Sequence, residues 1–227
     1  MTKVISLGGS LIAPNLVDEN FINNFKEIVI NFLNKDKERR LILVTGGGAT
    51  ARSYQNALRA LAPAVSNDEL DWLGIAATKI NAALIKAVFA DYCPEPIADN
   101  PETAPFNKGR ILVASGWKPG FSTDYDAAVL AGRFGGKVVI NLSNIDYLYD
   151  SDPKTNSNAQ KITHTSWNNL TAMLGTTWLP GSNLPFDPIA ALLAKQHGLT
   201  AIIAGGTNFA NIEAILEDKE YLGTTIN

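Results

Sequence analysis

The sequence has few residues of the kinds that hold structural or catalytic metal ions. It contains one cysteine, Cys93, and two histidines, His164 and His197, among 227 residues. A single cysteine excludes an internal disulfide and leaves a cysteine-based metal cluster without enough ligands. Two distant histidines likewise give too few ligands for a zinc site and no persuasive Ser-His-Asp arrangement. We expect Cys93 to be a buried small hydrophobe and both histidines to lie at the surface.

The sequence also has no excess of positive charge and no long apolar run. Nineteen lysines and arginines stand against 22 acidic residues, a formal net charge of −3, which lacks the basic footprint of a nucleic-acid surface. Residues 1–7 lead directly into glycines without the apolar segment of a signal peptide, and no later run approaches the length of a membrane span. We therefore expect a cytoplasmic protein with neither nucleic acid nor membrane as a partner.

What the chain does have is a set of apolar runs that end in glycines or hydroxyls. Val4–Leu7 precedes Gly8-Gly9-Ser10, Leu41–Val44 precedes the glycines 46–48, and Ile111–Ala114 precedes a polar loop. A buried strand that delivers glycines to a helix N-terminus offers backbone N–H groups to an anion, and the helix dipole adds to the attraction. One such stretch is equally consistent with a tight turn. Three of them in one predicted sheet favour a phosphate site.

The alternation of strands and helices predicts an α/β fold of one domain with two lobes. Further strands are expected at 137–142, 199–204 and near 223–226, with helices between them on both faces of a parallel sheet. The loops at the carboxyl ends of these strands are where a ligand should bind. A helix is expected from Trp72 to about Tyr92, with Asp68 as its cap and Asp71 as either a dipole partner or a ligand acceptor.

Two familiar nucleotide motifs fit the glycine loop poorly. No Gly-Lys-Ser/Thr follows the glycines, so the loop is not a Walker A motif. The series Gly46-x-Gly48-x-x-Ala51 does satisfy the dinucleotide fingerprint, and Asp68 or Asp71 lies at about the expected distance for a ribose contact. That acidic residue should end a second strand, however, whereas here it opens a helix. A nicotinamide-dependent oxidoreductase therefore stays as the third alternative.

Taken in order, the motifs resemble the amino-acid kinase superfamily, and within it the archaeal type of uridylate kinase. They are Gly8-Gly9-Ser10, 46–52, 71–74, 119–124, 144–153, Asp187-Pro188 and Gly223-Thr224. The resemblance implies an αβα sandwich with a central, mainly parallel sheet. It also implies transfer of the γ-phosphoryl group of ATP to UMP with the help of Mg²⁺, and a homo-oligomer, a hexamer built as a trimer of dimers. Residues 1–227 would form one domain, roughly 1–135 binding the acceptor and roughly 136–227 binding ATP.

The same resemblance assigns site residues. Around the ATP phosphates it places Gly9, Ser10, Gly48 and Arg52, of which Arg52, Gly9 and Ser10 would be catalytic. Around the adenine and ribose of ATP it places Ser143, Asn144, Tyr149 and Asp152. Around UMP it places Gly47, Asp71, Trp117, Lys118, Pro119, Gly120, Phe121, Ser122 and Thr123. It assigns no residue as a metal ligand.

The chain departs from the family's pattern at several positions. Ser6 and Ala49 stand where relatives commonly carry lysine, Lys118 stands in place of a histidine, and Tyr147 replaces a usual glycine. Residues 181–187 also differ from the small-residue run of the family. Losing a cation beside a transferring phosphoryl group costs several kcal/mol of transition-state stabilisation, for which Lys118 is a candidate replacement. The alternatives are a non-catalytic nucleotide or oxyanion binder of the same fold, or a kinase with a different small acceptor.

Overall fold

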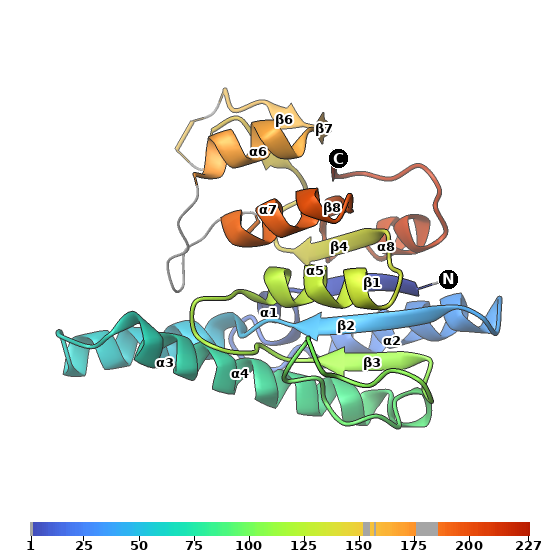
Figure 1. Ribbon diagram of the computed structural model, residues 1–227, viewed down its shortest axis with the longest axis horizontal. Helices are drawn as coiled ribbons and strands as arrows, with labels where there is room; N and C mark the ends of the chain where they lie inside the picture. The colour runs from blue at the N-terminus through green and yellow to red at the C-terminus, as the bar shows by residue number, and fades with distance from the viewer. Residues whose placement is uncertain (1, 152–154, 157, 176–185) are drawn as a thin grey trace.

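The fold is built on one seven-stranded sheet with the order β3-β2-β1-β4-β8-β9-β7 (Figure 1). The computed structural model describes residues 2–151, 155–156, 158–175 and 186–227. The strands of this sheet are β1 (Thr2–Leu7), β2 (Arg40–Thr45), β3 (Ile111–Ala114), β4 (Val138–Ser143), β7 (His164–Thr165), β8 (Thr200–Gly205) and β9 (Thr224–Ile226). A separate antiparallel pair is formed by β5 (Leu148–Tyr149) and β6 (Lys161–Ile162).

The sheet is mainly parallel, as the strand and helix alternation predicts. Ile5 of β1 pairs with Leu43 of β2 on one side and with Ile140 of β4 on the other, both in parallel register. Only the pairing of β9 with β8 is antiparallel among the described strands of this sheet. The predicted α/β sandwich is confirmed, and the carboxyl ends of β1, β2, β3, β4 and β8 all lie at one edge.

Several helices begin at residues whose side chains accept a hydrogen bond from the first turn. The Asp18 side chain accepts from the Phe21 N–H at the start of α2 (Glu19–Asn34). The prediction of Asp68 as a cap is wrong, because Ser66 caps α4 (Asn67–Val88) in a reciprocal capping box with Glu69. The other helices are α1 (Gly9–Ile12), α3 (Gly48–Leu61), the 3-10 turn η1 (Ala90–Tyr92), α5 (Thr123–Arg133), α6 (Trp167–Leu174), α7 (Pro188–Gln196) and α8 (Phe209–Leu216).

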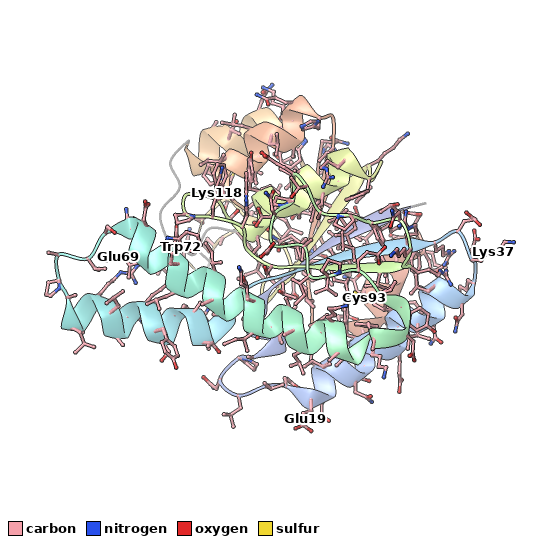
Figure 2. All side chains as sticks on the ribbon, turned by 60° about the horizontal axis from the view of Figure 1, so that its bottom comes forward. Glu19, Lys37, Glu69, Trp72, Cys93 and Lys118 are labelled. Carbon is pink, nitrogen blue, oxygen red and sulfur yellow. The ribbon has the colours of Figure 1, made fainter. Side chains whose placement is uncertain are left out.

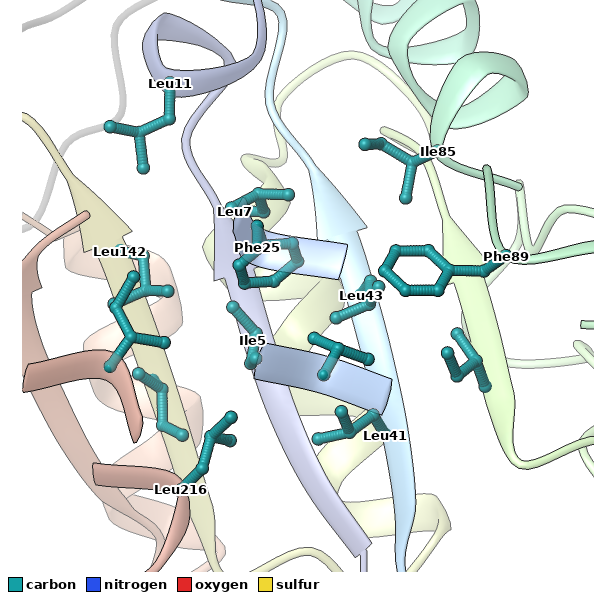
Figure 3. Close-up of a cluster of buried hydrophobic side chains, with 14 of the residues drawn as sticks. Ile5, Leu7, Leu11, Phe25, Leu41, Leu43, Ile85, Phe89, Leu142 and Leu216 are labelled. Atoms are coloured by element: carbon teal, nitrogen blue, oxygen red, sulfur yellow. The ribbon is translucent and has the colours of Figure 1, made fainter. Parts of the chain in front are cut away.

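Apolar side chains cover both faces of the sheet because successive residues of a strand point to opposite sides. Ile5 and Leu43 pack with Phe25 of α2 and Phe89 after α4 on one face (Figure 3). Val4 packs with residues of α5 and α7 on the other face. Two buried cores therefore hold the sheet between helical layers, which fixes its carboxyl-end loops relative to one another. Among the described residues, no helix has the length and apolar character that crossing a bilayer requires.

α3 and α4 pack against each other as a hairpin that extends beyond the sheet (Figure 1). Glu69 and Trp72 lie near the end where the two helices are joined (Figure 2). Cys93 lies instead in the body of the molecule, where it is 2% exposed, as predicted. His164 and His197 are both exposed, which confirms their prediction as surface residues.

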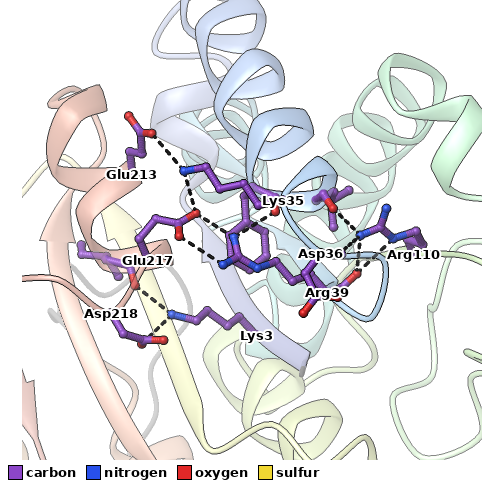
Figure 4. Close-up of polar contacts among 11 residues, drawn as sticks. Lys3, Lys35, Asp36, Arg39, Arg110, Glu213, Glu217 and Asp218 are labelled. Atoms are coloured by element: carbon purple, nitrogen blue, oxygen red, sulfur yellow. Dashed lines mark hydrogen bonds and ion pairs between the residues drawn. The ribbon is translucent and has the colours of Figure 1, made fainter.

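A charged network closes the opposite edge of the sheet, where the strands begin (Figure 4). The buried Lys3 ammonium donates to the Ile215 carbonyl and to Asp218, 2.7 Å away. Arg39 donates through both terminal nitrogens to Glu217 at 2.7 and 3.1 Å. The hydrogen bond from Arg39 lowers the pKa of Glu217 to about 2. These contacts tie α8 to the start of β1 and to the turn before β2.

Candidate active site

The carboxyl-end loops meet at one cleft of about 940 Å³. The loop after β1 contributes Gly8 and Ser10, and the loop after β2 contributes Gly47 and Gly48. The loops after β3 and β4 contribute further side chains, among them Gly116, Phe121, Ser143 and Asn144. The prediction that the loops at the carboxyl ends of the strands lie together is confirmed, and the binding of a ligand there stays a prediction.

The glycine loops touch backbone to backbone. A Cβ atom on Gly9 would lie 2.2 Å from the Gly48 nitrogen, and one on Gly48 would lie 2.3 Å from the Gly9 oxygen. Gly48 also has a φ of +65°, in the left-handed region that favours glycine. Gly9 is buried and does not line the cleft, whereas Ser10, Gly47 and Gly48 do. The structure therefore gives Gly9 the task of allowing the two loops to approach.

α3 points its N-terminus into this cleft. Its N-cap, Gly47, has no side chain to accept a hydrogen bond from the first turn, so the positive end of a 14-residue helix faces the cleft. Arg52 lies one turn inside α3, is exposed, and lines the same cleft. Backbone N–H groups, a helix dipole and a guanidinium together form a site for an anion.

The acceptor side that the resemblance implies is a wall made by α3, α4 and the loop after β3. Asp71 in the first turns of α4 is 8% exposed and lines the cleft, where its Oδ2 accepts from the Gly120 N–H at 2.8 Å. Gln55 of α3 lines the same wall and donates from Nε2 to the Leu70 carbonyl at 2.9 Å. Sequence reasoning missed Gln55, although its position three residues after Arg52 on the same helix face could have suggested it.

The loop Trp117–Thr123 is divided between the cleft and the outside. Phe121, Ser122 and Thr123 line the cleft, whereas Trp117, Pro119 and Gly120 do not. The Ser122 hydroxyl accepts from the Tyr125 N–H as the cap of α5, which begins at Thr123.

Lys118 also lies outside the cleft lining. Its ammonium lies 3.7 Å from the centre of the Trp117 ring and 5.1 Å from that of Phe121. Cation–π contact of this kind holds the side chain on the aromatic surface of the loop. Lys118 as a replacement for a missing lysine stays a prediction, and its side chain would have to leave these rings to act in the cleft.

Three aspartates lie close together at the cleft, and one of them, Asp124, is part of its lining. Asp124 accepts from the Ser6 hydroxyl at 2.7 Å and from the Asn141 amide at 2.9 Å. Burial raises the pKa of Asp124 to about 6. The hydrogen bond from Ser6 lowers this pKa, and the negative charge of Asp187 raises it. Asp187 accepts from the Ser122 hydroxyl, and burial raises its pKa as well.

Asp126 is the most deeply buried of the three, with 0% exposure. Its Oδ2 accepts from the Trp117 N–H at 3.2 Å, and its Oδ1 is the one buried side-chain oxygen or nitrogen in the described part of the chain that lacks a partner. Burial raises the pKa of Asp126 well above its ordinary value, and the charges of Asp124 and Asp187 add to the effect. Sequence reasoning assigned none of these three carboxylates a role.

The donor side that the resemblance implies is less polar. Ser143, Asn144 and Tyr149, which the resemblance assigns to ATP, line the cleft together with Tyr147. Side chains of α6 complete this wall, namely Leu170, Met173 and Leu174. An apolar surface beside hydroxyl and amide groups suits a flat base and its sugar. Asp152, the remaining residue of this predicted set, lies outside the described residues, as do residues 181–185.

Comparison with known proteins settles the family. The model of the amino acid kinase family matches residues 1–205. The chain belongs to this family. It is 34% identical to a uridylate kinase from Methanocorpusculum labreanum over 232 aligned residues, which cover 100% of this chain and 96% of that protein. It is 32% identical to a uridylate kinase from Thermoplasma acidophilum, covering 99% and 96%.

Solved structures of uridylate and UMP kinases share the fold of this chain. The crystal structure of uridylate kinase from Archaeoglobus fulgidus superposes with a TM-score of 0.80 at 28% identity, and the two chains cover each other fully. UMP kinase from Bacillus anthracis gives a TM-score of 0.79 at 19% identity, with 100% of this chain and 95% of that chain covered.

Three of the departures from the family's pattern lie in described residues with defined contacts. The Ser6 hydroxyl donates to Asp124, the Ala49 N–H donates to the Ala13 carbonyl at 3.4 Å, and the third is Tyr147. Tyr147 lies in the cleft lining with the Lys161 ammonium 5.0 Å from its ring centre.

The donor groups of the cleft fit a magnesium ion that arrives with a nucleotide. In the described ranges, no group of three or more histidine, cysteine or acidic side chains could hold a metal. Mg²⁺ nevertheless binds commonly through one or two carboxylates plus substrate phosphates, and Asp124 and Asp150 line this cleft. Because Asp124 already accepts two side-chain hydrogen bonds, these residues suit an ion carried mainly by phosphate oxygens.

Proposed function

We propose that this amino acid kinase transfers the γ-phosphoryl group of ATP to UMP, giving UDP and ADP. The observation that carries the proposal is the likeness to archaeal uridylate kinases over nearly the full chain. The cleft agrees with it, because one anion site at Gly47, Gly48 and Arg52 lies between a polar wall and an apolar wall. Two nucleotides could thus place their phosphates against the same loops.

Phosphoryl transfer asks for positioning and charge more than for covalent participation by the protein. In our proposal the N–H groups of the loop and of α3 hold the phosphates, Gly47 facing the acceptor and Gly48 the donor, while Arg52 stabilises the charge that develops during transfer. Mg²⁺ bound with the triphosphate would neutralise phosphate charge, and Asp124 and Asp150 are two of the cleft-lining carboxylates that would hold it.

In our proposal the two walls of the cleft bind different nucleotides. Residues of roughly 1–135, including Asp71, Phe121, Ser122 and Thr123, would bind UMP. Residues of roughly 136–227, including Ser143, Asn144 and Tyr149, would bind ATP.

We also propose a hexamer built as a trimer of dimers. The exposed apolar side chains on the α3–α4 hairpin support burial against another copy, since Leu61 is 84% and Ile80 is 66% exposed. We place the protein in the cytoplasm because both proposed substrates are intracellular nucleotides.

A non-catalytic nucleotide or oxyanion binder is the second candidate. Ser6 and Ala49 favour it, because neither supplies an ammonium beside the glycine loops. It predicts tight binding of ATP with no phosphoryl transfer to any acceptor.

An ADP-release assay with UMP, CMP, carbamate and acidic amino acids separates these candidates. We expect turnover with UMP; turnover with a non-nucleotide acceptor alone would reject UMP as the substrate. Arg52→Ala should lower kcat by about 100-fold or more with little change in folding. Arg59→Ala, at the exposed far end of α3, is the matched control and should keep wild-type kcat. Full activity of Arg52→Ala would remove Arg52 from the site.

A further inference from the structure

Gln55 is a buried amide in the wall of the cleft. It lies in α3 one turn beyond Arg52, its side chain is 5% exposed, and it lines the cleft beside Asp71 and Gly74. Glutamine is usually an exposed residue, so its burial here asks for a reason. The hydrogen bond from its Nε2 to the carbonyl of Leu70, the residue before Asp71, fixes the amide between α3 and α4.

The surroundings of this amide fix which of its ends faces Leu70. The Leu70 carbonyl can only accept, so the amide nitrogen must be the end that faces it. A Cβ atom on Gly74 would lie 2.9 Å from that nitrogen, so the glycine leaves the space in which the amide lies. Oε1 is not among the fully buried polar atoms of the described residues that lack a partner. One N–H of Nε2 is taken by Leu70, and Oε1 is the acceptor that this amide can offer to a ligand in the cleft.

The wall therefore offers two kinds of acceptor side by side, the Gln55 amide oxygen and the Asp71 carboxylate. Acceptors select ligand groups that carry hydrogens. The 2′- and 3′-hydroxyls of a ribose are two neighbouring donors, whereas uracil offers one ring N–H between two carbonyl oxygens. Gln55 lies seven residues after Gly48, roughly 10 Å along the helix axis. That span suits a nucleotide whose phosphate is held at the glycine loop and whose sugar reaches Gln55.

We propose that Gln55 accepts a hydrogen bond from one ribose hydroxyl of the acceptor nucleotide and so favours ribonucleotides over deoxynucleotides. The inference rests on the proposed function, since it takes UMP as the acceptor. Gln55 is a specificity-determining residue in this proposal and takes no part in the transfer itself.

The test is equilibrium binding of UMP, 2′-deoxy-UMP and 3′-deoxy-UMP by calorimetry to the wild type and to Gln55→Met. Methionine keeps the length of the side chain without its polar atoms. We expect affinity for UMP to fall about 3- to 10-fold, while affinity for one of the two deoxynucleotides changes less than 2-fold. Equal weakening of all three ligands, or unchanged binding of UMP, would overturn the proposal.

Two further variants keep the test decisive. Gly74→Ala should displace the amide and reproduce the same selective loss in a helix that alanine favours, which covers the case in which Gln55→Met fails to fold. Asn56→Met, on the exposed neighbouring position, should change none of the three affinities. Wild-type protein that discriminates among the three ligands yet transfers no phosphoryl group would reject the proposed function alone. Wild-type protein that binds no UMP would reject both.

Discussion

The buried carboxyl group of Asp124 should make the stability of this protein fall as pH rises. Its pKa is about 6 in the folded state, raised first by burial, against an ordinary value of 3.8. That difference corresponds to about 3 kcal/mol. The largest effect we expect from Asp124 is therefore about 3 kcal/mol of unfolding free energy.

The sign follows from which state loses its proton first. Below pH 3.8 Asp124 is protonated in both the folded and the unfolded chain, so its titration does not affect stability. As pH rises from 3.8 to about 6, the unfolded chain ionises first and is favoured, and above about 6 the loss is complete. Asp126 and Asp187, whose pKa values are also raised, add a slope of the same sign.

The experiment is urea unfolding of the wild type and of Asp124→Asn at a series of pH values across this window. Asparagine cannot ionise, so the wild type should lose about 2–3 kcal/mol more than the variant between the two ends of the window. The change with pH is the quantity to compare, because the variant also alters the hydrogen bonds from Ser6 and Asn141. Asp150→Asn, which removes an exposed carboxylate of the same cleft, should follow the wild-type profile. Parallel profiles for the wild type and Asp124→Asn would refute the reasoning.

Glu95 and Glu217 give two further predictions: a loss of stability when Glu95 is replaced, and a pH dependence of stability at Glu217 that is opposite in sign to that of Asp124. Glu95 is 3% exposed and accepts from the N–H groups of Asn107, Lys108 and Gly109, so Glu95→Ala should lower the free energy of unfolding by about 3 kcal/mol or more in urea, with Glu95→Gln losing less. A loss below 1 kcal/mol would mean that this carboxylate does not organise the 94–109 connection. Glu217, whose pKa is lowered to about 2 chiefly by the hydrogen bond from Arg39, contributes stability that is present above pH 4.5 and is lost as pH falls toward 2. Glu217→Gln should be less stable by about 1–3 kcal/mol at neutral pH and should lose less on acidification, measured by thermal unfolding across that window.

The sequence alone determined many of the strands and helix starts, because they depend on interactions between residues that are close in the chain. The runs 41–44 and 111–114 became buried parallel strands because continuous apolar segments of that length suit a sheet covered on both faces. Asp18 caps α2 because its carboxylate reaches an N–H three residues away. The start of α4 was mispredicted for an equally local reason, since Ser66 and Glu69 compete with Asp68 for the same cap and together form the box.

The tertiary structure decided contacts within the cleft that spacing along the chain does not show. Ser6 and Asp124 form a hydrogen bond although 118 positions separate them in the sequence, and Asp71 and Gly120 do so at a separation of 49. No local sequence pattern could have paired these residues. Spacing along the chain likewise did not predict the buried oxygen of Asp126 or the contact of Lys118 with the Trp117 ring. Strands and turns follow from interactions within a few residues, which a sequence displays directly. The site depends on contacts that exist only once the sheet has aligned the ends of distant strands.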